Sequence, residues 1–172
     1  MALGQDSVLN QDLPEQQRKK VMVLHSYDLG FVWVQNLNKG IVKGLSEERF
    51  YDGRNITIQY FYMDTKRKAS EEWKQEVAEK AINAIRKMNP DVVIATDDNA
   101  QKYVVAKFKD SSIPFVFAGV NADPASYGYI DSMQSPGHNV TGSIERERFE
   151  QSVRFLRKLQ PNINNIAIIC DR

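Results

Sequence analysis

Residues 91–100 read Asp-Val-Val-Ile-Ala-Thr-Asp-Asp-Asn-Ala, so a wholly apolar run leads directly into a polar one. Val92–Ala95 lack the alternation of a half-buried strand, and they therefore predict a short strand that is covered on both faces. A polar loop follows at 96–99. Beyond it, Ala100, Val104 and Phe108 lie four residues apart, as on the buried stripe of a helix. This strand–loop–helix order is typical of a parallel sheet with helical crossovers.

Four further strands are predicted from apolar runs on both sides of this segment. The run at 56–63 alternates with polar residues in its first half, so we expect it nearer a sheet edge. Alternating strands and helices predict an α/β fold with helices on both faces of the sheet. The handedness of crossovers favours a flavodoxin-like parallel sheet in the order 2-1-3-4-5. The further strands are Val21–Leu24, Ile56–Met63, Phe115–Ala118 and Val140–Ile144.

Three more helices are predicted from apolar residues that recur at helical spacing. Ser70 is a plausible N-cap for the second of them, and Asn89-Pro90 ends that helix because proline cannot continue it. Pro161 ends the last helix, and a final strand is predicted at Ile166–Ile169. The apolar stripes are Leu37, Ile41 and Leu45; Trp73, Val77, Ala81, Ile85 and Met88; and Phe149, Val153, Leu156 and Leu159.

The composition excludes several classes of protein. Among the 172 residues, 23 Lys and Arg balance 22 Asp and Glu, so the net charge of +1 gives no field that would attract nucleic acid. No apolar run approaches the roughly 18–20 residues that a membrane span needs. Cys170 is the single cysteine, which excludes an intrachain disulfide and a cysteine-rich zinc site. Residues 1–18 lack apolar periodicity and are interpreted as a disordered leader.

The fold itself nominates a ligand site. In open parallel sheets, ligands bind beyond the carboxyl ends of the strands. The adjacent pair Asp97 and Asp98 follows one such end. In the functional interpretation, one of them caps the next helix and the other points toward a ligand amine or hydroxyl; in the structural alternative, they only cap the helix. The carboxyl-end segments are His25–Asp28, Asp64–Arg67, Asp97–Asn99, Asn121–Asp123 and Glu145.

Aromatic and basic residues near these ends also allow two interpretations. Tyr27 and Trp33 either form a pocket wall, since small-molecule sites combine aromatic surfaces with a few polar groups, or pack as a lid over the strand-to-helix turn. Asn121 lies in a segment that is a turn by composition and a site loop by position. The basic run at 66–68 either binds an anion or is a solvated loop.

Catalytic and cofactor motifs have little support. Ser26 is not in a Gly-x-Ser-x-Gly elbow, and the two histidines, His25 and His138, are predicted in separate loops, where solvated or hydrogen-bonded histidines are favoured over a metal or nucleophile pair. Phosphate-binding and dinucleotide fingerprints are absent. A response-regulator receiver would need a lysine where Glu145 stands. We therefore expect no cofactor and no enzyme, with a small α/β enzyme that uses Asp97 and Asp98 as the less favoured alternative.

Several motifs occur together and in order that resemble one known family. The chain is similar to the ABC-transporter substrate-binding family of uncharacterised periplasmic components, whose related modules also serve as extracytoplasmic sensor domains of histidine kinases and diguanylate cyclases. The motifs are Val-Leu-His-Ser-Tyr at 23–27, Tyr-Met-Asp-Thr-Lys-Arg at 62–67, residues 91–100 quoted above, Pro-Phe-Val-Phe-Ala-Gly-Val-Asn at 114–121 and Asn-Val-Thr-Gly at 139–142.

This resemblance implies the fold of a type I periplasmic binding protein, in which two α/β lobes close around a small molecule. Residues 19–145 would form the N-terminal lobe. Residues 146–172 would supply the crossover helix and the first strand of a second lobe that is truncated there, and a second copy of the chain is expected to cover that strand as a homodimer. The implied ligand-binding residues are Ser26, Tyr27, Trp33, Asp97, Asp98, Asn99 and Asn121.

The resemblance also implies a function. We expect an extracytoplasmic small-molecule binding domain, for which the family's amino-acid receptors suggest an amino acid, acting as the solute-binding component of an ABC transporter with a membrane permease as its partner. The alternatives are a periplasmic sensor domain of a membrane histidine kinase or diguanylate cyclase, and a structural dimerisation module. A periplasmic location requires a secretory signal, and the polar segment Met1–Gln17 does not supply one.

Overall fold

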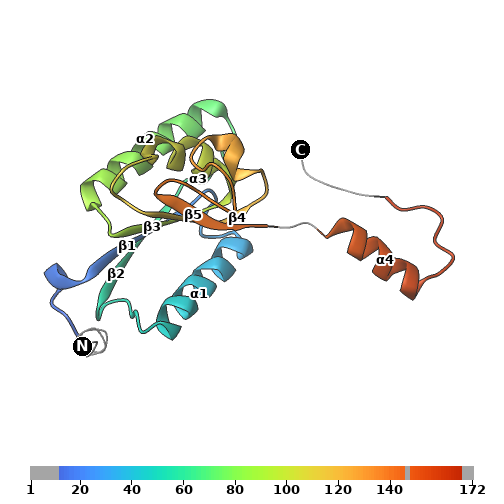
Figure 1. Cartoon of the computed structure of the whole chain (residues 1–172), viewed down its shortest axis with the longest axis horizontal. Coiled ribbons are helices and arrows are strands. Elements are labelled where there is room, and N and C mark those ends of the chain that lie inside the picture. The colour runs from blue at the N-terminus through green and yellow to red at the C-terminus, as the bar shows by residue number, and fades with distance from the viewer. Residues whose placement is uncertain (1–11, 146–147, 168–172) are drawn as a thin grey trace.

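The computed structural model describes residues 12–145 and 148–167 (Figure 1). Five strands form one sheet in the order β2-β1-β3-β4-β5, and each neighbouring pair is parallel. The predicted flavodoxin-like order is confirmed, and β2 lies at the expected edge. The strands are β1 (Lys19–His25), β2 (Ile56–Tyr62), β3 (Val92–Thr96), β4 (Phe115–Val120) and β5 (Val140–Ile144).

Helices cover both faces of the sheet, as predicted. In Figure 1, α1 lies on one side of the strands, and α2 and α3 lie together on the other. This arrangement leaves the carboxyl ends of the strands accessible to the loops that connect them to the helices. The helices are α1 (Val32–Glu47), α2 (Glu71–Met88), α3 (Asp97–Tyr103) and α4 (Phe149–Leu159), and the 3-10 turns are η1 (Glu15–Gln17), η2 (Val105–Phe108) and η3 (Pro124–Tyr127).

The ends of α2 follow the signals in the sequence. The Ser70 hydroxyl accepts a hydrogen bond from the Trp73 backbone N–H at 3.2 Å, which confirms the predicted N-cap. At the other end, Asn89 adopts a left-handed conformation with φ of 47°, and Pro90 follows it. Asparagine tolerates that conformation better than most residues, so the helix stops where the sequence indicated.

The prediction of a single helix from the apolar stripe at 100–108 is wrong in one respect. The structure breaks it at Val104, between α3 and η2. Val104 and Val105 are both fully buried, although neighbouring side chains on a regular α-helix point about 100° apart. The change to a tighter turn brings both β-branched side chains into the core, and Ala100 and Phe108 stay buried as predicted.

The core has two unequal parts. The larger cluster lies between the sheet and the α2–α3 layer, and it is built around residues such as Leu24, Ile85 and Phe117. The smaller cluster lies under α1, where Ile41 and Leu45 pack against the sheet while remaining half-buried. The α1 face is therefore the less completely covered side of the sheet.

The C-terminal segment has a different character. α4 carries no buried residue, and large apolar side chains such as Phe155 and Leu159 are 60% and 67% exposed. Figure 1 shows α4 standing away from the sheet. Ile166 and Ala167 form no strand, and the rest of the strand predicted at 166–169 lies outside the described residues. The truncated second lobe and the homodimer across its edge stay predictions.

The described part of the leader contacts the lobe. The Leu13 N–H donates to the Arg54 carbonyl at 2.8 Å, and the Arg18 side chain donates to the Leu13 carbonyl at 2.9 Å. Residues 1–11 of the predicted leader lie outside the described residues. Within 12–145 and 148–167, every helix is too short or too polar to cross a lipid bilayer.

Candidate functional site

The register of the sheet brings the predicted site loops to one edge. His25 pairs with Tyr62 on one side and with Thr96 on the other, and Thr96 pairs with Ala118. These residues end or nearly end their strands, so the loops that follow β1, β2, β3 and β4 leave the sheet side by side. We call this the carboxyl edge. All seven predicted ligand-binding residues follow strands that end there.

Ser26 organises the edge from within. Its side chain is fully buried, and its hydroxyl donates to the Thr96 carbonyl at 2.8 Å while accepting from the Ala100 backbone N–H at 2.8 Å. Ser26 thus satisfies an N–H in the first turn of α3 from a neighbouring loop, whereas Thr96 at the N-cap position makes no side-chain cap. In this structure Ser26 positions α3 and does not reach the surface.

Asp97 is a buried carboxylate in a strained backbone conformation. It is 3% exposed, and its φ of 63° is rare for a residue other than glycine. Its Oδ1 accepts from the Trp33 indole N–H at 2.9 Å, and its Oδ2 accepts from the Thr96 hydroxyl at 3.0 Å. Burial raises the pKa of Asp97 to about 6; these two hydrogen bonds oppose that rise, and the charges of Asp98 and Glu145 add to it.

A chain of buried polar contacts continues behind Asp97. The Thr96 hydroxyl oxygen lies 2.9 Å from Nδ1 of His25, and Nε2 of His25 lies 2.7 Å from Oδ1 of Asn38. Asn38 in turn donates to the Tyr62 hydroxyl at 3.3 Å, and the Tyr62 ring stacks on the imidazole with 5.3 Å between centroids. We call Asp97, Thr96, His25, Asn38 and Tyr62 the inner chain. Burial lowers the pKa of His25.

The inner chain accounts for His25 without metal or nucleophilic chemistry. Both ring nitrogens have partners within the fold, as the hydrogen-bonded interpretation predicted, although His25 ends strand β1 instead of lying in a loop. His138 contacts Asp110 and Asp131 at 2.6 and 3.2 Å. Among the described residues, no group of three His, Cys, Asp or Glu side chains has the geometry to hold a metal ion.

Trp33 links the inner chain to the surface. Its indole is half-buried, and it lies against the backbone of Gly119, whose φ is 65°. A Cβ atom at Gly119 would lie 3.2 Å from Cζ2 of Trp33 and 3.5 Å from Oδ1 of Asp97. The exposed part of the indole begins a groove of about 380 Å³ that runs along α1. This groove, which we call the α1 groove, is lined by Trp33, Asn36, Leu37, Gly40 and Ile41.

Asp98 and Asn121 meet, as their positions predicted. Oδ2 of Asp98 accepts from the backbone N–H of Asn121 at 3.3 Å and lies 3.4 Å from its side-chain nitrogen. Oδ1 accepts from the Ala122 N–H at 3.1 Å and from the Tyr127 hydroxyl at 2.9 Å. Asp98 therefore holds the loop after β4 and does not cap its own helix.

Asn99 ties the loop after β2 to the same edge. Its amide donates to the Thr65 hydroxyl at 2.9 Å, and Thr65 donates to the Ser26 carbonyl at 2.7 Å. In that loop, the Arg67 guanidinium pairs with Asp64 at 2.7 Å and lies 3.5 Å from Asp28. Because Arg67 is already paired with carboxylates, the solvated-loop interpretation of the basic run suits it better than an anion site.

Tyr27 lies in an aromatic corner of the carboxyl edge. Its ring meets the Phe31 ring edge-on, with 5.5 Å between centroids, and the Lys66 ammonium lies 5.5 Å from the Tyr27 centroid and 4.7 Å from that of Phe31. Burial raises the pKa of the Tyr27 phenol to about 12, and the charges of Asp97, Asp98 and Glu145 add to the shift. The phenol is therefore a neutral hydrogen-bonding group at physiological pH.

Sequence reasoning gave no individual role to four residues that build this edge, namely Thr96, Thr65, Gly119 and Tyr127, although Thr65 lies in the nominated segment Asp64–Arg67. Gly119 carried a usable signal, because a glycine inside a strand pattern often marks a close backbone approach. The contact of His25 with Thr96 follows from pairing their strands in register. The partners of Thr65 and Tyr127 lie 34 and 29 residues away in the chain, and no local pattern indicates them.

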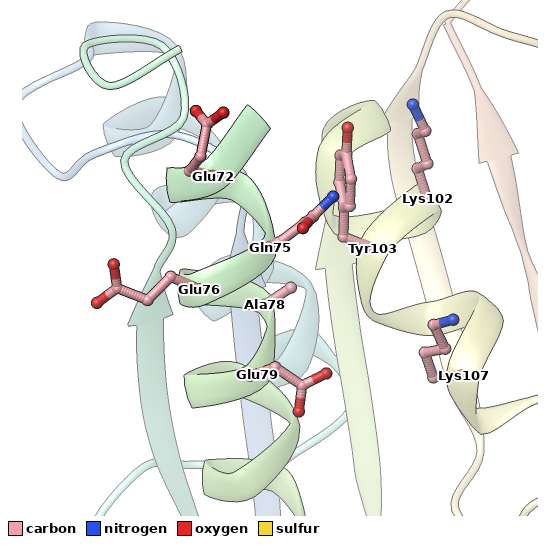
Figure 2. Close-up of a pocket in the computed structure, with 8 residues that line it drawn as sticks. All are labelled: Glu72, Gln75, Glu76, Ala78, Glu79, Lys102, Tyr103 and Lys107. Atoms are coloured by element: carbon pink, nitrogen blue, oxygen red, sulfur yellow. The ribbon is translucent and has the colours of Figure 1, made fainter. Parts of the chain in front are cut away.

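A larger groove of about 640 Å³ lies elsewhere, between α2 and α3 (Figure 2). In Figure 2, Gln75 and Glu79 project from α2 toward the side that carries Tyr103 and Lys107. The Tyr103 hydroxyl lies 2.8 Å from the Glu71 carboxylate at its margin. None of the seven predicted ligand-binding residues lines this groove, so its size alone does not make it the site.

The comparisons with known proteins agree with the fold. A family model described as ABC transporter substrate binding protein matches residues 34–172. A tyrosine-binding protein of Clostridioides difficile (strain R20291) is 24% identical over 131 residues, which is 76% of this chain and 35% of that protein. The chain thus spans about a third of the length of this curated relative.

Two solved structures show the same fold. A conserved domain protein of Vibrio cholerae O1 biovar El Tor strain N16961 matches with a TM-score of 0.65 and 24% identity, and an ABC domain of Streptococcus pneumonia in complex with L-Trp matches with a TM-score of 0.65 and 21% identity. Each match covers 84% of this chain and 44% of the other.

Proposed function

The chain belongs to the ABC transporter substrate-binding protein family, and on that premise we propose that it binds a free L-amino acid with an aromatic side chain, outside the cytoplasm. Membership of this family indicates a binding role and not catalysis. One relative is named for tyrosine, and one structure of the same fold contains L-Trp. These names describe those proteins, and they supply the ligand class that we propose for this one.

The observation that carries the proposal is the meeting of aromatic and acidic groups at the carboxyl edge. Trp33 and Tyr27 offer flat apolar surfaces, and Asp98 offers a carboxylate oxygen 3.4 Å from the side-chain nitrogen of Asn121. An amino acid needs an anionic or amide partner for its ammonium group and an apolar wall for its side chain. Asp98 already faces four donors of the loop after β4, so a ligand ammonium group would replace one of them, and the long contact to the Asn121 side-chain nitrogen at 3.4 Å is the weakest.

The predicted site residues divide into two roles in this proposal. Tyr27, Trp33, Asp98 and Asn121 face the ligand, because each is half-buried or exposed at the edge, whereas the equally half-buried Asn99 already donates its amide to Thr65. The others hold the loops that carry them. Delivery of the bound ligand to a membrane permease is the proposed use of the complex. The sensor-domain alternative stays a prediction, which the genes adjoining this one would test. The supporting residues are Ser26, Asp97 and Asn99.

An NMR titration of the ¹⁵N-labelled chain tests the proposal and also detects weak, millimolar binding. We expect L-tryptophan or L-tyrosine to shift the amide signals of 97–99 and 121 and the Trp33 indole signal in a saturable way. D-tryptophan and L-glutamate are the controls for stereochemistry and side chain. A Lys107→Ala variant, changed in the α2–α3 groove, should titrate like the wild type. Shifts confined to the α2–α3 groove, or equal shifts with the control amino acids, would contradict the proposal.

A further inference from the structure

We propose that Asp97 is a positioning residue that fixes the Trp33 indole as the wall of the α1 groove, and that Trp33 thereby selects ligands with a flat apolar group. This inference rests on the proposed function, since it assigns the side-chain specificity of the same site. It gives different roles to two residues that were both predicted to bind the ligand. Trp33 touches the ligand, and Asp97 acts through Trp33.

Asp97 is unsuited to touch a ligand itself. It is 3% exposed, and each of its oxygens already has a donor from the chain, Trp33 on one side and Thr96 on the other. Trp33, in contrast, is half-buried and forms the end of the α1 groove. The Asp97 carboxylate therefore lies buried behind the Trp33 indole, and the indole forms the surface of the groove.

The indole is held on two sides. Its N–H is fixed by Asp97 at 2.9 Å, and its six-membered ring lies against Gly119, where even a methyl group would approach Cζ2 to 3.2 Å. A tryptophan in the first turn of a helix would otherwise have a choice of rotamers. These two contacts remove that choice before a ligand arrives, which lowers the entropic cost of binding.

Asp97 is itself held in place by the inner chain. Its left-handed backbone is unfavourable for an aspartate, so the surrounding contacts must maintain it. Thr96 contacts both the carboxylate and the His25 imidazole, which in turn contacts Asn38 on α1. Trp33 lies on the same helix as Asn38. The inner chain and the bond from Trp33 to Asp97 therefore join the first two turns of α1 to the end of β3 at two points.

The α1 groove explains the preference for a flat apolar group. Apart from Asn36, its lining is the indole, two aliphatic side chains and Gly40. A Cβ atom added at Gly40 would have no heavy atom within 4 Å, so the floor of the groove is open there. We expect a planar ring to lie against the exposed part of the indole, because aromatic rings favour stacked and edge-on contacts with one another.

Two substitutions at one position test the inference. Asp97→Asn keeps an oxygen that accepts from the indole, and asparagine tolerates the left-handed conformation. Asp97→Gly removes the acceptor, while glycine adopts a positive φ more readily than aspartate, so the fold is retained. The chain has two tryptophans, and the Trp73 indole donates to the Met63 carbonyl at 2.9 Å. Its indole signal is therefore an internal control in each variant.

The first readout is hydrogen exchange of the two indole N–H groups without ligand, and the second is the affinity for L-tryptophan and L-tyrosine. We expect Asp97→Gly to accelerate exchange at Trp33 by about tenfold or more, with Trp73 unchanged, and to weaken binding about tenfold. Asp97→Asn should stay within about threefold of the wild type in both.

Unchanged exchange at Trp33 in Asp97→Gly would overturn the inference, and so would a released indole with undiminished affinity. Equal loss of affinity in both variants, with the Trp33 indole still protected in Asp97→Asn, would show direct contact of the carboxylate with the ligand and would also overturn it. Absence of binding by the wild type would instead contradict the proposed function, while the ligand-free exchange would still decide whether Asp97 holds Trp33.

Discussion

Gly119 and Trp33 approach each other so closely that a Cβ atom on the glycine would lie 3.2 Å from Cζ2 of the indole. Gly119 belongs to β4 and Trp33 to the start of α1, so this contact joins two elements that are far apart in sequence. The left-handed backbone of Gly119, with φ of 65°, adds a second reason for glycine. The position of the indole in the candidate site depends on this one missing side chain.

Gly119→Ala is therefore expected to displace the indole and to destabilise the fold. The positive φ alone costs a residue with a Cβ about 1–2 kcal/mol, and crowding against Trp33 adds to it. Urea unfolding measures the loss of stability, and Trp33 indole exchange measures the displacement. The matched control is Gly44→Ala in α1, where an added Cβ meets nothing within 4 Å and should stabilise the helix by about 0.5–1 kcal/mol. Equal effects of the two substitutions would contradict this account.

The raised pKa of Asp97 predicts a pH dependence of stability. Its pKa of about 6 lies above the 3.8 of an unperturbed aspartate, so the folded chain binds this proton more tightly than the unfolded chain does. The resulting contribution to the free energy of unfolding is fully present below about pH 4 and is lost as the pH rises through about 6. It amounts to about 3 kcal/mol. Asp98 and Glu145 are the charged groups that strengthen the shift.

Asp97→Asn isolates this effect from other titrations. His25, across Thr96, has a lowered pKa, so its own contribution is present above its unfolded value and is lost as the pH falls. Because the pKa shifts of both groups make stability depend on pH, only the difference between variant and wild type reports on Asp97. We expect the variant to gain relative stability between pH 4 and 7 in urea unfolding. Parallel curves for the two proteins would contradict the assignment.

Ser26→Ala is predicted to destabilise the chain through α3. The substitution leaves the Ala100 backbone N–H buried without its acceptor, which costs about 1–2 kcal/mol. Ser46, a half-buried residue of α1 whose hydroxyl donates to the Lys43 carbonyl in a solvent-exposed hydrogen bond, is a suitable comparison, and its alanine variant should stay within about 0.5 kcal/mol of the wild type. Thermal unfolding of both variants tests the difference. A similar small effect at both positions would show that Ser26 does not hold α3.

Particular residues show why the sheet could be predicted and parts of the site could not. Apolar runs such as Val92–Ala95 report burial on both faces, and burial with short connections fixes the strand order. The site depends on finer features. The left-handed backbone of Asp97 has no signal in residue type, since aspartate is common at helix starts. Its bond to Trp33 joins residues 64 positions apart.

The break at Val104 has the same origin. The four-residue spacing of Ala100, Val104 and Phe108 predicts one helix, because this pattern takes account of a single apolar stripe. The structure buries Val105 as well, and the helix changes to a 3-10 turn to do so. Tertiary packing overrides local periodicity there. Placement after strands that end at the carboxyl edge was therefore predictable for all seven predicted ligand-binding residues, whereas their individual contacts were not.

Substitutions at Asp98 and Tyr127 can distinguish a residue that contacts the ligand from one that only supports a loop. Asp98→Ala removes the acceptor of the Ala122 N–H and the Tyr127 hydroxyl, so we expect faster hydrogen exchange across 121–127 and weaker binding of aromatic amino acids. Tyr127→Phe removes only the hydroxyl contact and leaves Asp98 in place, and it should loosen the loop without reducing affinity more than about threefold. Exchange measured by mass spectrometry and affinity measured by calorimetry distinguish the roles. Weak binding by Asp98→Ala with unchanged exchange would make Asp98 a ligand contact alone, whereas fast exchange with full affinity would make it a loop support alone.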